Sequence, residues 1–385
     1  MKLSEYIAAS IAPRQMASGP TRKAQLAHSR AHYLAHRASE KVLARGISAD
    51  FWESTLPPAP GAWHVVTVKA RPEALRPATV KAKRKAKAAV KAKRKANAAP
   101  VLGRDAAMSL AIDAIAGNFD KLRGLASGDR DRGTWGFYAS KLLKWIEAGM
   151  PGRPPFKIFA KGNSKLPFSA FSALPLVTCP GAGACGKFCY SFRAWRYPAA
   201  FMRQLMNTIL LQTEAGKAIL AKAFMRLPGG KLRLFVDGDF ANVDQVFFFM
   251  GLIAARPDLR VYGYSKSWTE LLAAQLRGIN WPANYLLNLS SGSAHGEGLR
   301  NAVAGLPIAR GEFIARTVAA EHIKNRAYQG RARAGFPAYR KAIQDAMPGE
   351  RIFVCPGKCG SCLPGGEHAC GSEKFRGVKI VIGVH

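Results

Sequence analysis

Acidic side chains are scarce in this sequence. Its 385 residues include 24 Asp and Glu against 58 Lys and Arg, which gives a formal net charge of +34 at pH 7 and a pI near 10.4. A field of that sign and size favours polyanionic partners, with nucleic acid first and an anionic membrane surface second. The composition does not indicate which base sequence or which type of nucleic-acid strand is bound. The hydrophobic share of 48% is ordinary for a globular protein.

The sequence also has no long apolar run. The longest, at 246–255, is too short to cross a bilayer, so no membrane is expected as a partner. Glu5 interrupts the stretch in which a signal peptide would need an unbroken apolar region, so export is not expected. These absences predict a protein of the reducing cytoplasm, where thiolates stay available to iron or zinc.

Cysteine is rare and confined to two short stretches. An odd number of cysteines, clustered a few residues apart, suits metal ligation better than a disulfide framework. We call these stretches the first and second cysteine groups. The first group is Cys179, Cys185 and Cys189, and the second is Cys355, Cys359, Cys362 and Cys370.

The first cysteine group follows an apolar run, 174–178, which predicts a strand ending in a cysteine-bearing loop. Pro180, Gly181 and Gly183 break the strand pattern and let the backbone approach a bound centre closely. Three thiolates can converge on one metal centre and leave it one ligand short of four, and an open coordination position suggests chemistry. The alternative is three packed thiols, because cysteine is among the most buried residue types.

The second cysteine group lies in a loop dense in glycine and proline, with His368 as a spare candidate ligand. Four thiolates this close in sequence can close a tetrahedral zinc site by themselves or hold an iron–sulfur cluster. A full set of ligands favours a structural or electron-relay role over a catalytic one. Separate packing of the four thiols is the weaker alternative.

Composition divides the chain into three parts. Residues 1–77 predict a small, mostly helical N-terminal region, and residues 78–100 predict a disordered linker rich in Lys and Arg. Residues 101–385 predict an α/β domain that contains both cysteine groups.

The linker repeats the heptapeptide VKAKRKA at 80–86 and 90–96, with no acid between the copies. Like charges at that density repel, and little apolar surface is left to pack. One interpretation is a salt-sensitive grip on phosphates, because neutralised phosphates release counterions and no side chain here can read bases. The other is a solubilising linker. The candidate nucleic-acid contacts are Lys81, Lys83, Arg84, Lys85, Lys87, Lys91, Lys93, Arg94 and Lys95.

Strands and helices alternate in the last part of the chain. Alternation at this interval means βαβ units and a mostly parallel sheet, and we expect a partial (β/α) barrel. Helices are expected at 106–119 and 135–149, and one long helix at 199–225. The main predicted strands are 231–240, 260–267, 284–293, 312–318, 351–354 and 378–384.

Reactive groups gather at the carboxyl ends of parallel strands. That rule places the first cysteine group at one mouth together with polar residues that follow the next three strands. For Asp237 and Asp239 the alternative is a turn and a helix N-cap. The candidate cofactor-binding residues are Asp237, Gly238, Asp239, Ser265, Lys266, Asn288 and Ser290.

Several motifs together resemble a known family. They are a triplet C-x5-C-x3-C followed by Tyr190, DGDF after a strand, PDLRVYGYSKS after a helix, and a late FVCP cysteine loop. This combination resembles the gene-product-88-like proteins of phages and plasmids over residues 155–372. More distantly, it is similar to the radical S-adenosylmethionine enzymes. Their partial (β/α) barrel carries three cysteines in the loop after its first strand, which hold a [4Fe-4S] cluster that binds S-adenosylmethionine.

The distant resemblance implies roles for individual residues. By position, the first cysteine group would ligate the cluster, with Phe188 before its third member as in those enzymes. Residues 237–239 would stand where those enzymes bind the methionyl amine. The spacing usual in those enzymes, C-x3-C-x2-C, occurs here at Cys355, Cys359 and Cys362 instead.

Three functional hypotheses follow. The first is a mobile-element-encoded iron–sulfur enzyme of radical S-adenosylmethionine type, acting on nucleic acid or on a nucleic-acid-bound partner, with a second cluster or zinc in the second cysteine group. The second is a non-catalytic nucleic-acid-binding protein in which both cysteine groups are zinc or iron–sulfur staples. The third is a metal-dependent nuclease that uses Asp237, Asp239 and Asp244.

Overall fold

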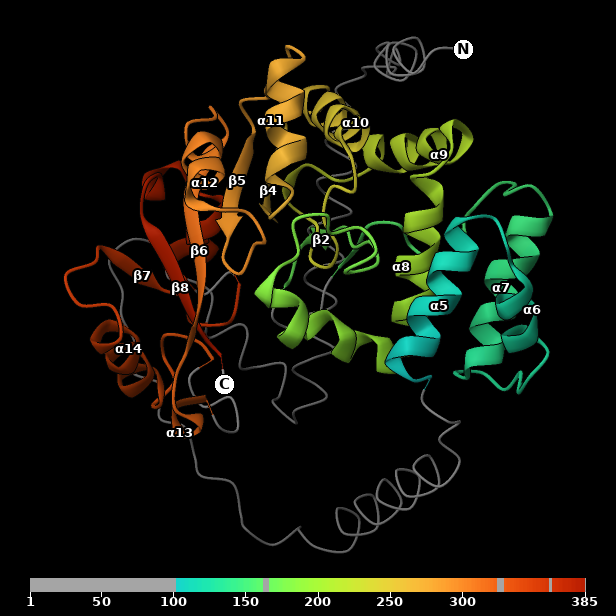
Figure 1. Ribbon diagram of the computed structural model, residues 1–385, viewed down its shortest axis with the longest axis horizontal. Coiled ribbons are helices and arrows are strands. Elements are labelled where there is room, and N and C mark those ends of the chain that lie inside the picture. The colour runs from blue at the N-terminus through green and yellow to red at the C-terminus, as the bar shows by residue number, and fades with distance from the viewer. Residues whose placement is uncertain (1–101, 162–165, 324–328, 360–361, 385) are drawn as a thin grey trace, which may run out of the picture. The chain divides into compact units, whose positions relative to one another are not determined.

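A mostly parallel sheet organises the part of the chain that the computed structural model describes, residues 102–384 without 162–165, 324–328 and 360–361. The strand order is β1-β2-β3-β4-β5-β6-β8-β7 (Figure 1), and every neighbouring pair is parallel except β1 with β2. Among the described strands β1 and β7 form the two edges, so this sheet is open. The strands are β1 (Ala160–Lys161), β2 (Ser169–Ala170), β3 (Gly230–Leu234), β4 (Leu259–Ser265), β5 (Tyr285–Ser290), β6 (Ala309–Thr317), β7 (Ile352–Val354) and β8 (Lys379–Val384).

Helices connect the neighbouring parallel strands, as the alternating sequence pattern predicts. Crossovers between adjacent parallel strands are almost always right-handed, which places successive helices on the same face of the sheet. Figure 1 shows α10, α11 and α12 in sequence beside β4, β5 and β6. The helices of this region are α8 (Pro198–Leu210), α9 (Glu214–Met225), α10 (Val243–Ala254), α11 (Trp268–Leu276), α12 (Glu297–Ala304), α13 (Ala320–Ile323) and α14 (Phe336–Asp345).

The two faces of the sheet bury different partners. Leu232, Val261 and Leu287 belong to the main core, which also contains the buried side chains of the connecting helices. Tyr262 and Leu286, at the alternate positions, belong to another cluster together with residues of the second cysteine loop. Because successive strand residues point to opposite faces, helices cover one face and the second cysteine loop lies on the other.

Three helices precede the sheet: α5 (Arg104–Ile115), α6 (Asp120–Ala126) and α7 (Trp135–Glu147). Thr134 caps α7 by accepting a hydrogen bond from the backbone N–H of Phe137. Trp135 packs edge-on against Phe201 of α8, with the ring centroids 5.5 Å apart. The helices expected at 106–119 and 135–149 are therefore present, and they contact the main domain through α8.

Local structure differs from the sequence prediction in two places. The run 174–178 forms a turn and not a strand, because Leu176 has a φ of 64° and the backbone N–H of Thr178 bonds back to the Leu174 carbonyl. The long helix expected at 199–225 is two helices, because the side chain of Thr213 caps a new helix start by accepting from the backbone N–H of Gly216.

The described residues all belong to one compact unit. The predicted N-terminal region 1–77 and the linker 78–100, with its nine candidate phosphate contacts, lie outside the described residues. No helix in the described part of the chain is long and apolar enough to cross a membrane.

Candidate functional site

The first cysteine group lies in a loop that is fastened to the end of β5. The backbone N–H groups of Gly183 and Cys185 both donate to the Gly292 carbonyl at 3.2 Å, and the N–H of Ala294 donates to the Gly181 carbonyl at 3.0 Å. An isolated bridge pairs Ala182 with Ser293. The loop after β2 therefore reaches across the carboxyl ends of the parallel strands, which is the place predicted from the sequence.

Two glycines permit this close approach. A Cβ added at Gly181 would overlap the carbonyl of Lys266, which follows β4. Gly292 has a φ of 77°, and a Cβ there would stand 3.1 Å from the Cβ of Cys185. These positions require residues without a side chain because backbone meets backbone.

Asp239 joins the cysteine loop to the end of β4. Its carboxylate accepts hydrogen bonds from Ser265 Oγ at 2.7 Å and from the backbone N–H of Lys266 at 2.6 Å. Its own backbone N–H donates to Thr178 Oγ1 at 3.3 Å, directly before the first cysteine. Burial raises the pKa of Asp239, whereas these donors lower it. A carboxylate so enclosed holds the strand ends in place.

Asp237 performs a similar task on the other side of the loop. Its two carboxylate oxygens accept from Ser191 Oγ at 2.5 Å and from Gln204 Nε2 at 3.0 Å. Ser191 follows the last cysteine of the first group, so Asp237 ties that end of the loop to α8. Burial raises the pKa of Asp237 and hydrogen bonding by Ser191 opposes the shift. The N-cap of α10 is Asn242, so the alternative in which an aspartate caps this helix is wrong.

The remaining predicted cofactor-binding residues fall into two places. Lys266 Nζ donates to Ser290 Oγ at 2.8 Å, which links the ends of β4 and β5 beside the first cysteine group. Gly238, with a φ of 79°, turns the chain between the two aspartates. Asn288 instead faces the second cysteine loop, where its Nδ2 donates to the carbonyl of Cys370 at 2.9 Å.

The three thiols of the first group are free and half-buried. Burial raises the pKa of Cys179 to about 12, and the charges of Asp239 and Cys189 add to the shift while Lys266 opposes it. Cys179 therefore shares its surroundings with Asp239, Lys266 and Cys189. Within residues 102–384, apart from the three short gaps, no three His, Cys, Asp or Glu side chains stand close enough together to hold a single metal ion.

In the second cysteine group all four thiols influence one another electrostatically. Every pair among its four thiols is close enough for the charge of one to raise the pKa of another. Burial is the largest cause of the raised pKa of Cys370, about 11, and both a hydrogen bond with Tyr264 and the charge of Arg310 oppose it. Cys355 Sγ accepts a hydrogen bond from the backbone N–H of Gly357 at 3.4 Å.

Several residues of these sites had no sequence signal of their own. Arg310 is fully buried and connects β6 to the segment between the second cysteine loop and β8 by donating to the carbonyls of Phe375 and Val378. Gln204 and Ser191 hold Asp237. Tyr264 lies in β4, where successive side chains point to opposite faces of the sheet. Its position two residues after Tyr262 is the one sequence feature that places it on the face opposite the helices.

The structure does not bring together the three aspartates of the nuclease hypothesis. Asp237 and Asp239 are buried and fully engaged, whereas the side chain of Asp244 is 75% exposed on α10 with Arg277 3.9 Å away. The hypothesis requires these three carboxylates to lie at one place, and they do not.

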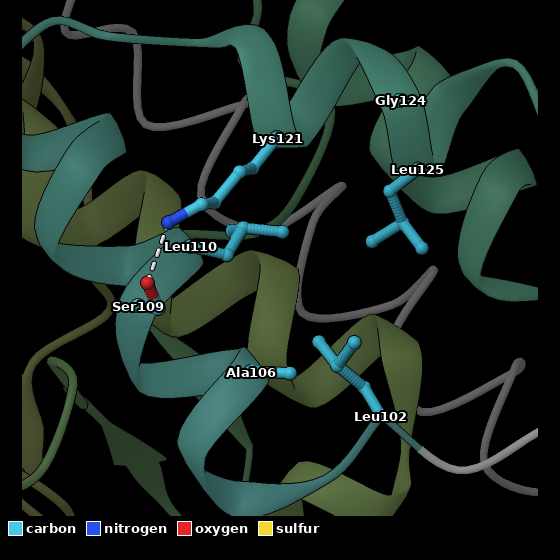
Figure 2. A pocket seen from close by; sticks show the side chains of 7 residues that line it. All are labelled: Leu102, Ala106, Ser109, Leu110, Lys121, Gly124 and Leu125. Carbon is cyan, nitrogen blue, oxygen red and sulfur yellow. Dashed lines mark hydrogen bonds between the residues drawn. The ribbon is translucent and has the colours of Figure 1, made fainter.

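A hollow of about 420 Å³ lies between α5 and α6 (Figure 2). Leu102, Leu110 and Leu125 point into it, and Lys121, at its edge, donates to Ser109 Oγ at 2.5 Å. None of its lining residues belongs to a cysteine loop or to a strand end. It provides apolar packing space and no reactive side chain.

The family model described as Gene product 88 matches residues 151–375. That span contains both cysteine groups, the two aspartates that anchor the first loop, and β1 through β7. No curated protein and no solved structure gives a significant match. The match confirms the resemblance drawn from the cysteine triplet, DGDF and FVCP motifs, and the chain belongs to the Gene product 88 family.

Proposed function

We propose that this chain is an iron–sulfur enzyme of the radical S-adenosylmethionine type, acting on nucleic acid or on a partner bound to nucleic acid. One observation supports it above the others. The loop of the first cysteine group is fastened across the carboxyl ends of neighbouring parallel strands, next to Asp239 and Lys266. Catalytic groups of (β/α) folds gather at that edge.

The topology supports a partial barrel. Strands β2 through β6 lie side by side in sequence order, and the chain between each parallel pair contains at least one helix. A half-closed (β/α) barrel requires a parallel sheet with helices on one face, and the proposal takes the open sheet and its connecting helices in this way. In this proposal the second cysteine loop occupies the inside of that barrel.

The donor set of the first group suits a cluster better than a single ion. One tetrahedral zinc ion needs its sulfur ligands within about 4 Å of each other. A four-iron cluster binds its cysteines at separate corners of a cube, so it does not require three thiols close enough together for a single ion, an arrangement that the described residues lack. With three protein ligands, such a cluster when bound supplies an electron and one iron free to bind S-adenosylmethionine.

The chain's own residues perform the positioning. Asp239 holds the ends of the cysteine loop and β4 at a fixed separation. Lys266 presents its ammonium group between Ser290 and Cys179, where it attracts the carboxylate of a bound amino-acid moiety. Gly181 lets the cysteine loop lie directly against the Lys266 carbonyl, and Gly292 lets the segment after β5 lie directly against Cys185.

Charge supports a nucleic-acid substrate. The basic excess is not confined to the linker, since residues 101–385 contain 38 Lys and Arg against 19 Asp and Glu. A field of that sign raises the local concentration of a polyanion around the domain that contains the strand-end site.

The test is anaerobic purification of the full chain, followed by iron, sulfide and zinc analysis and incubation with S-adenosylmethionine and dithionite. We expect about four irons in an open cluster, together with release of methionine and 5′-deoxyadenosine. Cys185→Ala should abolish both the cleavage and the corresponding iron. Its control is Ser127→Ala, at an exposed hydroxyl far from the cysteine loop in sequence, which should retain both. Zinc alone in the wild type, with no cleavage, would refute the proposal.

A non-catalytic nucleic-acid-binding protein is the second candidate, and the linker favours it, since its nine basic residues stand among no acids. Deletion of residues 80–96 should then weaken binding to DNA or RNA and flatten its salt dependence by about 0.9 in log–log slope for each phosphate that is no longer neutralised. Cys185→Ala should leave affinity unchanged. Cleavage of S-adenosylmethionine would exclude this candidate as a complete description.

A further inference from the structure

Tyr197 is the most exposed aromatic side chain that the structure describes, with 68% of its surface accessible. It follows η2 (Tyr190–Arg196), the 3-10 helix that begins directly after Cys189, and it stands at the N-cap position of α8. A single exposed apolar ring is ordinary on a protein surface, so the surroundings of the ring decide whether it belongs to a site.

The backbone beneath this ring is fixed on both sides. The N–H of Tyr197 donates to the Ala194 carbonyl at 3.0 Å. The carbonyl of Tyr197 accepts from the N–H groups of Ala200 and Phe201 at 2.9 and 3.1 Å. Trp195 is 3% exposed and packs edge-on against Phe201, with the ring centroids 5.2 Å apart. A tyrosine on such a base has little more than its two side-chain torsions to immobilise when it binds a partner.

The same base is connected to the edge where catalysis is proposed. Trp195 Nε1 donates to Gln204 Oε1 at 2.9 Å, and Gln204 Nε2 donates to the carboxylate of Asp237 at 3.0 Å. Asp237 also accepts from Ser191 in the first turn of η2. A molecule held by Tyr197 is therefore bound next to the element that follows the last cysteine of the first group.

Two exposed arginines accompany the ring. Arg196 directly precedes Tyr197, and Arg104, the first residue of α5, places its guanidinium 4.1 Å from the centroid of the Phe192 ring in η2. Figure 1 shows α5 beside α8, and η2 contacts both helices. Between residues 102 and 384, outside the three gaps, no carboxylate forms an ion pair with either arginine. We call Arg104, Phe192, Arg196 and Tyr197 the stacking surface.

We propose that the stacking surface binds single-stranded nucleic acid, with an unpaired base stacked on Tyr197 and phosphates held by the two arginines. The inference rests on the proposed nucleic-acid function and deepens it by naming the form of the substrate. An exposed aromatic ring accepts the face of any unpaired base, and arginine binds the phosphates beside it. The bases of a duplex are stacked on one another and offer only their edges, so they leave no face for Tyr197.

The charge of the surface argues against an apolar protein partner. Such a partner would cover Tyr197 but would also take Arg104 and Arg196 out of water without a counter-charge, which is costly. A nucleic-acid strand supplies an aromatic face and an anion in each repeating unit, so it satisfies the ring and the arginines together.

The test is fluorescence anisotropy with the full chain and labelled oligo(dT) of about 12 nucleotides, without S-adenosylmethionine. Salt at roughly 0.3 M weakens the electrostatic binding of the linker. We expect Tyr197→Ala to bind about 5- to 150-fold more weakly than the wild type, and Tyr197→Phe, which keeps the ring, to bind as the wild type does. Leu276→Ala, at a side chain that is 88% exposed on α11, is the control and should leave the affinity unchanged.

A duplex probe of the same length separates stacking from a folding defect. Tyr197→Ala should bind the duplex with wild-type affinity, and an equal loss on both probes would overturn the stacking role. Arg196→Gln leaves the ring in place and should reduce the slope of log affinity against log salt for the single strand by about 0.7. An unchanged slope would remove Arg196 from the surface.

These measurements do not depend on the proposed chemistry. Wild-type affinity of Tyr197→Ala for the single strand would overturn the stacking surface alone and leave the enzyme proposal standing. A wild type that binds neither probe would overturn the nucleic-acid function as well. Absence of S-adenosylmethionine cleavage, with single-strand binding that requires Tyr197, would refute the enzyme proposal and support the surface.

Discussion

The carboxylate of Asp239 and the backbone N–H of Lys266 meet at 2.6 Å, 27 residues apart in sequence. This contact joins the end of β3 to the end of β4 at the point where the first cysteine appears. Lys266 then turns its ammonium group to Ser290, at the end of β5. Hydrogen bonds thus connect the carboxyl ends of three neighbouring strands beside the cysteine loop, where the catalytic site is proposed.

Replacement of Asp239 by Asn should destabilise this edge. The amide nitrogen of Asn would face the donor groups of Ser265 or Lys266, which leaves a buried donor unsatisfied at a cost of about 1–3 kcal/mol. Urea unfolding measures the change in the free energy of unfolding. Asp244→Asn, on an exposed side chain, is the control and should change it by less than about 0.5 kcal/mol. Equal stabilities for the two variants would contradict the role given to Asp239.

Gly181→Ala should displace the cysteine loop. The new methyl group would overlap the Lys266 carbonyl, and a backbone clash of this kind costs about 1–3 kcal/mol. We expect lower stability and less metal per chain, measured by thermal unfolding and elemental analysis. Gly186→Ala in the same loop is the matched control, since its nearest neighbour, Leu176 Cδ2, would be at an ordinary 3.6 Å. If both variants retain wild-type metal content, the docking of the loop does not depend on Gly181.

Ser191→Ala should loosen the far end of the same loop. It removes the donor that Asp237 Oδ1 accepts at 2.5 Å and leaves a buried carboxylate oxygen unpaired. A loss of 1.4 kcal/mol corresponds to about tenfold in a local opening equilibrium. The readout is the alkylation rate of Cys189 in chelator-treated protein, followed by peptide mass spectrometry. Ser127→Ala, at an exposed hydroxyl, should leave that rate unchanged. No acceleration in Ser191→Ala would mean that Asp237 does not restrain the loop.

The ion pair of Asp258, directly before β4, should make the stability of the protein depend on pH. Hydrogen bonding by Arg256, at 2.7 Å to each carboxylate oxygen, lowers the pKa of Asp258 below 3.8. A lowered folded-state pKa stabilises the protein above the unfolded pKa, and this contribution disappears as the pH falls through the folded value. Asp258→Asn should therefore be less stable than the wild type at pH 7, and the difference should shrink below pH 3.8. Denaturant titrations at a series of pH values measure the free energy of unfolding of both proteins. A difference between them that stays unchanged below pH 3.8 would contradict this role of Asp258.

Much of the architecture could be predicted from local patterns. Short apolar runs at 231–234, 259–265 and 285–290, separated by helical segments, predict parallel strands with a helix between them. The pairing of two cysteine groups with DGDF and FVCP was enough to indicate the family. The strand predicted at 174–178 is instead a turn. Leu174 is buried there and Leu176 has a positive φ, and this tertiary environment outweighs the strand propensity of the run.

The amino-acid sequence by itself determined the order of strands and helices, the seven thiols and the excess of positive charge, because each depends on residues near one another in the chain. Tertiary structure alone decided that Asp237 and Asp239 serve as internal anchors and that Asn288 turns toward Cys370. It also placed Arg310 without a carboxylate partner in the described residues beside the second cysteine group. The cited hydrogen bonds join residues 26 to 82 positions apart, and the hydrogen-bond needs of buried polar groups select them only once the sheet has formed.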